Sequence, residues 1–385
     1  MECRNKVLYL LDDPTKDKHV HKFVLDGLTN SGFKPTILYF YGNEANSSMA
    51  NEQINAYSLG LSKSEFKGLN LNAVKALNKF IRSNRFSIVH AQRHRPLIHS
   101  ALALLGIKKT RLFYTVRATN VLRGVKRPLA FLCLGFKISK LICISYGVKD
   151  YVKKSLPFFP EKKLVVIHNG VDVKEFDLNI TKKEARSLLN IPKDDFCFGI
   201  VARLKKAKNH EGLIVAFKEL TCHFPNTNLI VVGDGPLENR LKNLTKDLGI
   251  FEKVFFVGKK AHKHIPKVLK AFDCFVHPSV REGLGVSVLE AMASGLPVII
   301  SDADGLKDIF SPRPGFRLSK EIGQMVKAKD VPSLFQAMRR YREMDLPKLQ
   351  KIGHNAREHV SSFFTKELMV KKTVELYKDY LNNPG

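Results

Sequence analysis

Two carboxylates and a pair of glycines lie close together in the segment Ser279–Asp302, where they could serve sugar chemistry. Glu282 directly precedes Gly283-Leu284-Gly285, and Glu290 lies inside a helix predicted over about Val286–Ser294. A glycine-rich loop that enters a helix presents free backbone N–H groups at the positive end of the helix dipole, which suits a diphosphate. Carboxylates repel phosphate, so these two fit better as acceptors for hydroxyl groups. An amphipathic helix with two solvent-facing glutamates is the alternative that spacing leaves open.

Two cations and a short glycine turn follow predicted strands nearby. Arg203 and Lys208 come after the strand Phe196–Ala202, and a guanidinium fork with a lysine point charge is a common pairing for phosphate oxygens. A solvated basic loop is the alternative reading. Gly233-Asp234-Gly235-Pro236 follows the strand Asn228–Val232, but it lacks the third glycine of a dinucleotide fingerprint and therefore indicates a strand-to-helix turn.

Short apolar runs alternate with helical patterns along the chain, which predicts parallel sheets covered by helices on both faces. The fold class is therefore α/β, with two doubly wound, Rossmann-like domains. A polar stretch, Lys174–Asp195, marks the predicted domain boundary. The predicted strands are Val7–Leu11, Thr36–Phe40, Ser87–Ala91, Arg111–Val116, Lys140–Ser145 and Lys163–Ile167, then Phe196–Ala202, Asn228–Val232, Val254–Val257, Ala271–His277 and Val298–Ser301.

The charge balance is strongly basic. The 385 residues carry a net charge of +28, and between Glu65 and Asp150 there are 17 basic residues and no acidic one. Such a field favours an anionic partner: nucleic acid, an anionic membrane leaflet or a phosphorylated substrate. The segment Leu129–Ile144 is the most apolar, and it reads either as core or as an interfacial helix that touches lipid. No apolar run is long enough for a transmembrane helix.

Four strings, taken in this order, resemble glycosyltransferase family 4, a retaining family with the GT-B fold. They are HNGVD from His168, ARLKKAKN from Ala202, GDGP from Gly233 and FVHPSVREGLGVSVLEAMASGLPVI from Phe275. The last string contains the E-x(7)-E signature of that family. The resemblance implies an acceptor-binding domain over residues 1–175, a nucleotide-sugar domain over residues 176–360, facing it across a cleft, and a C-terminal helix over residues 361–385 that returns to the first domain.

The resemblance also implies roles for single residues. Arg203 and Lys208 would grip the donor diphosphate, Glu282 would contact the transferred sugar, and Glu290 would hold the ribose hydroxyls. We group Glu282, Arg203 and Lys208 as catalytic. The donor-binding group consists of Glu290, Gly233, Gly283, Leu284, Gly285, Val286 and Ser287.

The N-terminal half departs from the family pattern. The first loop, Asp12-Asp13-Pro14-Thr15, has no glycine, Arg117 stands where the family often has His, and Asp308 stands where it often has Glu. These departures leave the acceptor open. The candidates for binding the acceptor or the sugar are Asp13, His94, Arg117 and Asn169.

No cofactor and no metal site are expected. Asp302-Ala303-Asp304 looks like a metal-binding D-x-D motif, but it follows a predicted strand of the donor domain and reads as a turn. His262 and His264 have no acidic or cysteine partner in the sequence, so zinc is not expected there. The resemblance implies a metal-independent hexosyltransferase with a UDP- or GDP-sugar as its substrate.

The resulting prediction is a retaining glycosyltransferase that moves a hexose-type sugar to a lipid-linked glycan in lipopolysaccharide or surface polysaccharide assembly. The acid-free basic stretch would place it on the cytoplasmic face of the inner membrane as a peripheral protein. A same-fold enzyme with a soluble acceptor, such as a sugar phosphate, is the first alternative. A basic nucleic-acid-binding protein is a remote second, because no zinc finger, RNP-like string or helix-turn-helix pattern is present.

Overall fold

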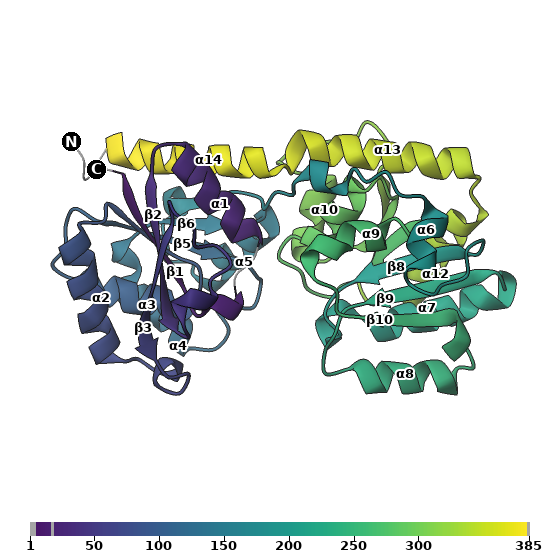
Figure 1. Ribbon diagram of the computed structural model, residues 1–385, viewed down its shortest axis with the longest axis horizontal. Helices are drawn as coiled ribbons and strands as arrows, with labels where there is room; N and C mark the ends of the chain where they lie inside the picture. The colour runs from purple at the N-terminus through teal and green to yellow at the C-terminus, as the bar shows by residue number, and fades with distance from the viewer. Residues whose placement is uncertain (1–4, 17–18, 383–385) are drawn as a thin grey trace. The chain divides into compact units, whose positions relative to one another are not determined.

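The chain forms two compact α/β units (Figure 1). In this computed structural model, which describes residues 5–16 and 19–382, unit 1 runs to Asn169 and resumes at Lys366. Unit 2 is the intervening segment, Gly170–Thr365. These divisions lie a few residues from the predicted ones after residues 175 and 360.

Unit 1 is built on a seven-stranded parallel sheet in the order β3-β2-β1-β4-β5-β6-β7. The strand order reverses between β1 and β4, and in open parallel sheets such a switch point is where ligands bind, at the carboxyl ends of the strands. The strands are β1 (Lys6–Leu11), β2 (Lys34–Tyr41), β3 (Asn55–Leu61), β4 (Ile88–Ala91), β5 (Arg111–Val116), β6 (Ile138–Cys143) and β7 (Leu164–Val166).

Helices cover both faces of this sheet, since alternate strand residues are buried on opposite sides. On one face, Phe113 packs against Tyr377 of the last helix, with ring centroids 5.1 Å apart. On the other face, Phe40 meets His99 of the third helix, with ring centroids 5.2 Å apart. The helices are α1 (His19–Asn30), α2 (Leu71–Asn84), α3 (His94–Ala103), α4 (Lys126–Leu134), α5 (Tyr146–Ser155) and α14 (Lys366–Asn382).

Unit 2 repeats this plan with six parallel strands in the order β10-β9-β8-β11-β12-β13. Its order reverses between β8 and β11, which pair in parallel with Phe275 opposite Gly199. The strands are β8 (Phe196–Val201), β9 (Thr227–Val232), β10 (Val254–Gly258), β11 (Cys274–His277), β12 (Val298–Ser301) and β13 (Gly323–Val326).

The main core of unit 2 lies between the sheet and two long helices. Phe198 of the sheet, Phe217 of α7 and Tyr341 of α12 are all fully buried there. The helices are α6 (Lys182–Ser187), α7 (His210–His223), α8 (Glu238–Asp247), α9 (Ile265–Leu269), α10 (Val286–Ala293), α11 (Lys307–Phe310), α12 (Val331–Glu343) and α13 (Leu346–Phe363).

Two local predictions need correction, and one carboxylate explains both. The polar stretch Lys174–Asp195, predicted as the domain boundary, lies inside unit 2: it contains α6, whose buried Arg186 donates to the carboxylate of Asp273 at 2.6 Å. That carboxylate also accepts the backbone N–H of Cys197 at 2.7 Å. Asp273 thereby ties α6 to unit 2, and it precedes a strand that begins at Cys274 rather than at Ala271.

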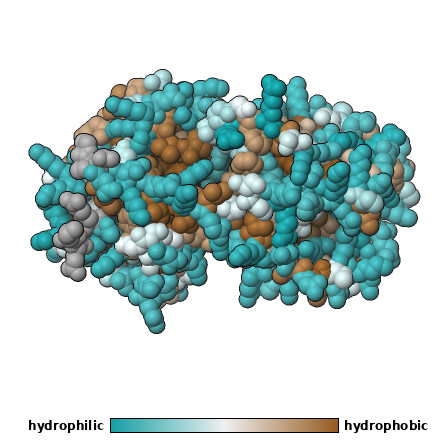
Figure 2. Space-filling model, turned by 90° about the horizontal axis from the view of Figure 1, so that it is seen from above, coloured by the Kyte–Doolittle hydropathy of each residue, from teal (hydrophilic) through white to brown (hydrophobic). Residues whose placement is uncertain are grey.

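The face drawn in Figure 2 shows apolar areas bordered by hydrophilic side chains. Within the residues that the structure describes, no helix is both long and apolar enough to span a bilayer.

Candidate active site

The loops after β8 and β11 lie together at the switch point of the unit 2 sheet. The backbone N–H of Val280, after β11, donates to the carbonyl of Ala207, after β8, at 2.8 Å. The N–H of Gly305, after β12, donates to the carbonyl of Glu282 at 3.3 Å. Three strand-end loops are therefore joined through their backbones, which fixes the side chains that they carry.

Glu282 is the centre of this arrangement. Its carboxylate forms an ion pair with Lys208, and its Oε2 lies 3.1 Å from Nε2 of His277, the last residue of β11. Burial lowers the pKa of His277 below its ordinary value, so the ring is neutral near pH 7. An ionised carboxylate only accepts hydrogen bonds, so the proton of His277 lies on Nε2 and is donated to Glu282.

The ionisation state of Glu282 follows from these contacts. Burial alone would raise its pKa, but the hydrogen bond from His277 and the positive charge of Lys208 lower it to about 2. The carboxylate is therefore negative throughout the physiological range. It can accept hydrogen bonds from hydroxyl groups, and it cannot supply a proton as a general acid.

A helix N-terminus opens beside this carboxylate. Gly283, Leu284 and Gly285 form the loop, and α10 begins at Val286 with Gly285 as its N-cap at φ 84°, a conformation that favours glycine. A Cβ atom on Gly305 would lie 1.9 Å from the carbonyl oxygen of Gly283, so only glycine allows the neighbouring loop to approach. The first N–H groups of α10, including that of Ser287, lack helical partners and are suited to an anion.

Glu290 lies one turn farther along α10 and is 5% exposed. The open possibility of a solvent-facing glutamate is therefore excluded at this position. Its Oε1 lies 3.0 Å from Nε2 of His262, and this hydrogen bond raises the pKa of His262 above its ordinary value. The histidine thus has an acidic partner in the fold that the sequence did not reveal.

The other residues that the sequence predicts for donor binding lie in the loops after β8 and β9. Arg203, two residues after the end of β8, is exposed, and Gly233, directly after β9, donates its N–H to the carbonyl of Gly258 at 3.0 Å. The carboxylate of Asp302 accepts the backbone N–H of Ala328 at 2.8 Å, and Asp304 is exposed. The side chain of Asp302 therefore stabilises the turn after β12.

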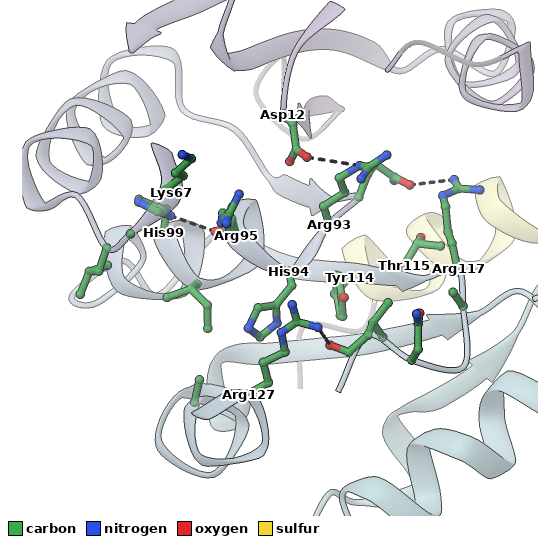
Figure 3. A pocket seen from close by; sticks show the side chains of 18 of the residues that line it. Asp12, Lys67, Arg93, His94, Arg95, His99, Tyr114, Thr115, Arg117 and Arg127 are labelled. Carbon is green, nitrogen blue, oxygen red and sulfur yellow. Dashed lines mark hydrogen bonds and ion pairs between the residues drawn. The ribbon is translucent and has the colours of Figure 1, made fainter. Parts of the chain in front are cut away.

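Unit 1 carries a pocket of about 810 Å³ at its own switch point (Figure 3). The pocket lies at the carboxyl ends of β1, β4 and β5 and is bounded by the first turns of α3 and by α4. Its charged lining residues are Lys67, Arg93, Arg95, Arg117, Arg127 and one acid, Asp12.

The four acceptor candidates all belong to unit 1, but only two line this pocket. These two are Arg117 and His94. Asn169 lies beside Arg117, and Nη1 of Arg117 donates a hydrogen bond to Oδ1 of Asn169 at 3.2 Å. His94 begins α3, and burial lowers its pKa to about 4. Asp13 is buried and accepts the backbone N–H of Thr15 at 2.9 Å, so it shapes the first loop, while its neighbour Asp12 lines the pocket.

Several residues of both sites were not singled out from the sequence. His277 had a signal, because it ends an apolar strand five residues before Glu282. Arg93, Arg95 and Arg127 had only the acid-free stretch to indicate them, since Arg127 is far from the other two in the chain and meets them through the topology of the sheet.

Two Rossmann-like parallel sheets of seven and six strands, each with helices on both faces, are the architecture of the GT-B glycosyltransferases. Residues 181–359 match the family described as "Glycosyl transferases group 1", and residues 23–175 match "Glycosyltransferase Family 4". The chain belongs to this family of glycosyltransferases.

Curated relatives and solved structures agree with this assignment. The chain is 27% identical over 323 residues to the Escherichia coli UDP-Gal:alpha-D-GlcNAc-diphosphoundecaprenol alpha-1,3-galactosyltransferase, covering 81% of this chain and 80% of that protein. It is 30% identical over 224 residues to the lipopolysaccharide core mannosyltransferase LpsB of Rhizobium meliloti, covering 56% and 61%.

Two solved structures share the fold over nearly the whole chain. One is a glycosyltransferase from Rickettsia africae, with a TM-score of 0.83, 21% identity and coverage of 98% of this chain and 99% of that one. The other is Anabaena HepE in complex with UDP and glucose, with a TM-score of 0.80, 19% identity and coverage of 97% and 99%.

Proposed function

We propose that the protein transfers a hexose-type sugar from a nucleoside-diphosphate sugar to a lipid-linked glycan, with retention of the anomeric configuration. The observation that carries the donor side is the contact of Lys208 and His277 with an ionised Glu282 at the entrance to α10. A carboxylate for hydroxyl groups and an N-terminus for phosphate lie side by side, which suits a sugar joined to a diphosphate.

The chemistry breaks the bond between the anomeric carbon and the diphosphate and forms a bond from that carbon to a hydroxyl oxygen of the acceptor, which gives up its proton. Negative charge grows on the departing diphosphate oxygen. Arg203, Lys208 and the N–H groups from Gly283 to Ser287 are placed to stabilise that charge, and removal of one such donor typically costs about 2.7–4 kcal/mol. Lys208 has three N–H bonds, so its pairing with Glu282 leaves two for phosphate oxygens. We propose that these groups take the part that a metal ion plays in other transferases.

The acidic side chains would bind the hydroxyl groups of the donor. Glu282 would accept a hydroxyl of the transferred sugar, and Glu290 would accept the ribose hydroxyls. Retention, metal independence and the UDP- or GDP-sugar as substrate follow from the family resemblance. The UDP and glucose bound by HepE and the UDP-galactose named for the E. coli relative support a nucleotide-sugar donor.

A thermal-shift screen with UDP-, GDP-, ADP- and CMP-sugars, each with and without EDTA, tests the donor side. We expect one nucleotide class to raise the melting temperature, and EDTA to leave that rise unchanged. Stabilisation by none of the four would contradict the donor site. NMR of the anomeric proton of the product then decides between retention and inversion.

The acceptor side rests on an exposed apolar stripe along α4. Val125, the N-cap of α4, and Leu129 and Leu132 within it are 82%, 54% and 60% exposed, and their spacing of four and three residues places them on one helical face. Phe136, in the 3-10 turn that follows α4, is 65% exposed. Basic side chains border the stripe: Lys137 lies 5.7 Å from the ring of Phe136, and Nζ of Lys163 donates to the carbonyl of Phe136 at 3.4 Å. Arg123 and Lys140 are nearby in the chain. An apolar face with a basic rim suits an anionic bilayer.

We propose that this stripe docks the protein as a peripheral protein on the cytoplasmic leaflet, beside a lipid-linked acceptor. The diphosphoundecaprenol in the name of the E. coli relative supports such an acceptor. The test is sedimentation with vesicles containing phosphatidylglycerol. The native chain should sediment, and Leu129→Ser with Leu132→Ser should remain in the supernatant.

The matched control changes two exposed apolar side chains elsewhere, Leu188→Ser with Leu346→Ser in unit 2. Equal sedimentation of all three proteins would contradict docking through α4. It would favour the alternative of a soluble acceptor such as a sugar phosphate.

A further inference from the structure

The pocket of unit 1 has a large excess of positive charge. Five cations line it against one carboxylate, Asp12, which pairs with Nε of Arg93 at 3.4 Å. Among the described residues, the remaining four cations have no carboxylate partner: Lys67, Arg95, Arg117 and Arg127. Like charges gathered in a concave site raise the local concentration of an anion.

The guanidinium groups are held in position by the protein. Nη2 of Arg117 donates to Oε1 of Gln92 at 2.8 Å, and Nη1 of Arg127 donates to the carbonyl of Val121 at 2.7 Å. Arg95 lies 5.5 Å from the ring centroid of Phe66. Each interaction uses one part of a fork and leaves other N–H groups available, and fixed forks lose little entropy when they bind an anion.

Two further groups in the pocket have unused hydrogen-bonding capacity. Nε of Arg117 is buried without a partner in the part of the chain that the structure describes, and so is Nδ1 of His94. His94 also stacks on Phe131, with ring centroids 6.1 Å apart, so its ring is fixed. The first N–H groups of α3, which begins at His94, add donors at the same pocket.

We propose that this pocket binds a phosphoryl group of the acceptor. Its role in the acceptor rests on the proposed function, whereas binding of the anion does not. Phosphate and diphosphate oxygens are the chemistry that paired guanidinium groups recognise, and a neutral sugar would leave the half-buried Arg117 and the three exposed cations around it without a counter-charge.

The source of the phosphoryl group is a lipid-linked diphosphate or a soluble sugar phosphate. Helix α4 favours the lipid, because Arg127 and Ala130 line the pocket while Leu129 and Leu132 of the same helix are exposed. A single helix thus offers a site for the charged group on one side and an apolar surface for the chain on another.

Chemical modification of arginines tests the site in the native chain. The protein is treated with phenylglyoxal, with and without inorganic pyrophosphate, and the modified residues are identified by mass spectrometry. We expect pyrophosphate to protect Arg95 and Arg127, and to leave the exposed Arg313 of unit 2 reactive. Arg203 reports on unit 2 in the same experiment, so the two sites are judged separately.

The possible outcomes are distinct. Protection of Arg203 alone, or of no arginine, would overturn the inference. Protection of Arg95 and Arg127 without any effect of nucleotide-sugars on Arg203 would support the pocket and contradict the proposed donor site. Farnesyl diphosphate and glucose 6-phosphate then distinguish the sources, since a lipid-linked acceptor predicts protection by the first at lower concentration.

A pair of variants gives an independent measurement. Arg95→Gln with Arg127→Gln should weaken pyrophosphate binding at least about tenfold in calorimetric titration, because each removes a charge-assisted hydrogen bond. Lys75→Gln with Lys79→Gln removes the same charge from an exposed face of α2 and should change the affinity less than about twofold. Equal losses in both variants would show a general charge effect and overturn a specific site.

Discussion

The two units place ligand-binding groups at the same topological point and balance their charges in opposite ways. At the switch point of unit 2, the carboxylates of Glu282 and Glu290 each contact a basic group within the same unit. At the switch point of unit 1, four cations of the pocket have no carboxylate partner among the described residues. Since the two sheets are alike, the difference in charge balance comes from the loops at the ends of their strands. It indicates what the loops of each unit bind.

A carboxylate held by local cations is ready to accept hydroxyl groups, because its charge is fixed before the ligand arrives. A set of cations without carboxylates is ready for an anion that supplies the missing charge. The comparison therefore assigns the hydroxyl-rich part of the reaction to unit 2 and a phosphorylated acceptor to unit 1. The following changes test it, in order of expected effect.

Glu282→Gln should have the largest effect. Glutamine keeps the shape of the side chain but loses the charge that pairs with Lys208 and accepts hydroxyl groups, so we expect kcat for sugar transfer to fall about 10²–10³-fold. Nucleotide affinity in calorimetry should change less than about threefold. Glu219→Gln on the exposed side of α7 is the control. Retention of more than about a third of native kcat would remove Glu282 from the reaction.

His277→Phe should lower kcat about tenfold at pH 7 and change the pH profile. The native carboxylate of Glu282 has a pKa of about 2, lowered by the hydrogen bond from His277, so it stays ionised from pH 5 to 8. Without that bond its pKa rises, and activity should be lost as the pH falls from 7 towards 4. His354→Phe, at an exposed position of α13, should keep the native profile. A flat profile for His277→Phe would mean that Lys208 alone fixes the charge.

Asp12→Asn should have a smaller effect, and it should strengthen the binding of an anion rather than impair function. Asp12 is the one acid among the described residues that line the unit 1 pocket, and its removal releases Arg93 and deepens the positive potential, so pyrophosphate should bind about threefold more tightly at low salt. The gain should shrink at high ionic strength, because salt screens a partly exposed charge. Weaker binding in this variant would contradict the charge contrast between the two units.

The sequence predicts the local parts of this arrangement better than the distant ones. The buried strands β1 and β8 are predicted from their apolar runs, and the start of α10 is predicted from the glycines that precede it. Helix α2 was not predicted, although Asn70 caps it and its buried residues Ala73, Leu77 and Ile81 recur at helical spacing. Lys208 and Glu282 are 74 residues apart, so their contact needed the family resemblance and the order of the sheet.

The unit 1 pocket shows more clearly what could not be predicted from the sequence. The acid-free stretch predicted an anionic partner, but it could not say which of its 17 basic residues converge. Arg95 and Arg127 converge because β4 and β5 are neighbours, whereas Lys75 and Lys79 are exposed on α2. The number of charges is a property of the sequence, and their grouping is a property of the strand order.

His262→Gln should have the smallest effect, and it sharpens the comparison on the unit 2 side. The hydrogen bond from His262 to Glu290 raises the pKa of the histidine in the folded state. Its stabilising contribution is therefore complete below the unfolded pKa of about 6.5 and is lost as the pH rises through the higher folded value. The native chain should melt roughly 1–3 °C above the variant at pH 5.5 and together with it at pH 9, by calorimetry. His264→Gln, an exposed neighbour, should melt with the native chain at both values. A difference in melting temperature that grew with pH would show that protonated His262 does not balance the charge of Glu290. The contrast in charge between the two switch points would then be smaller than their contacts indicate.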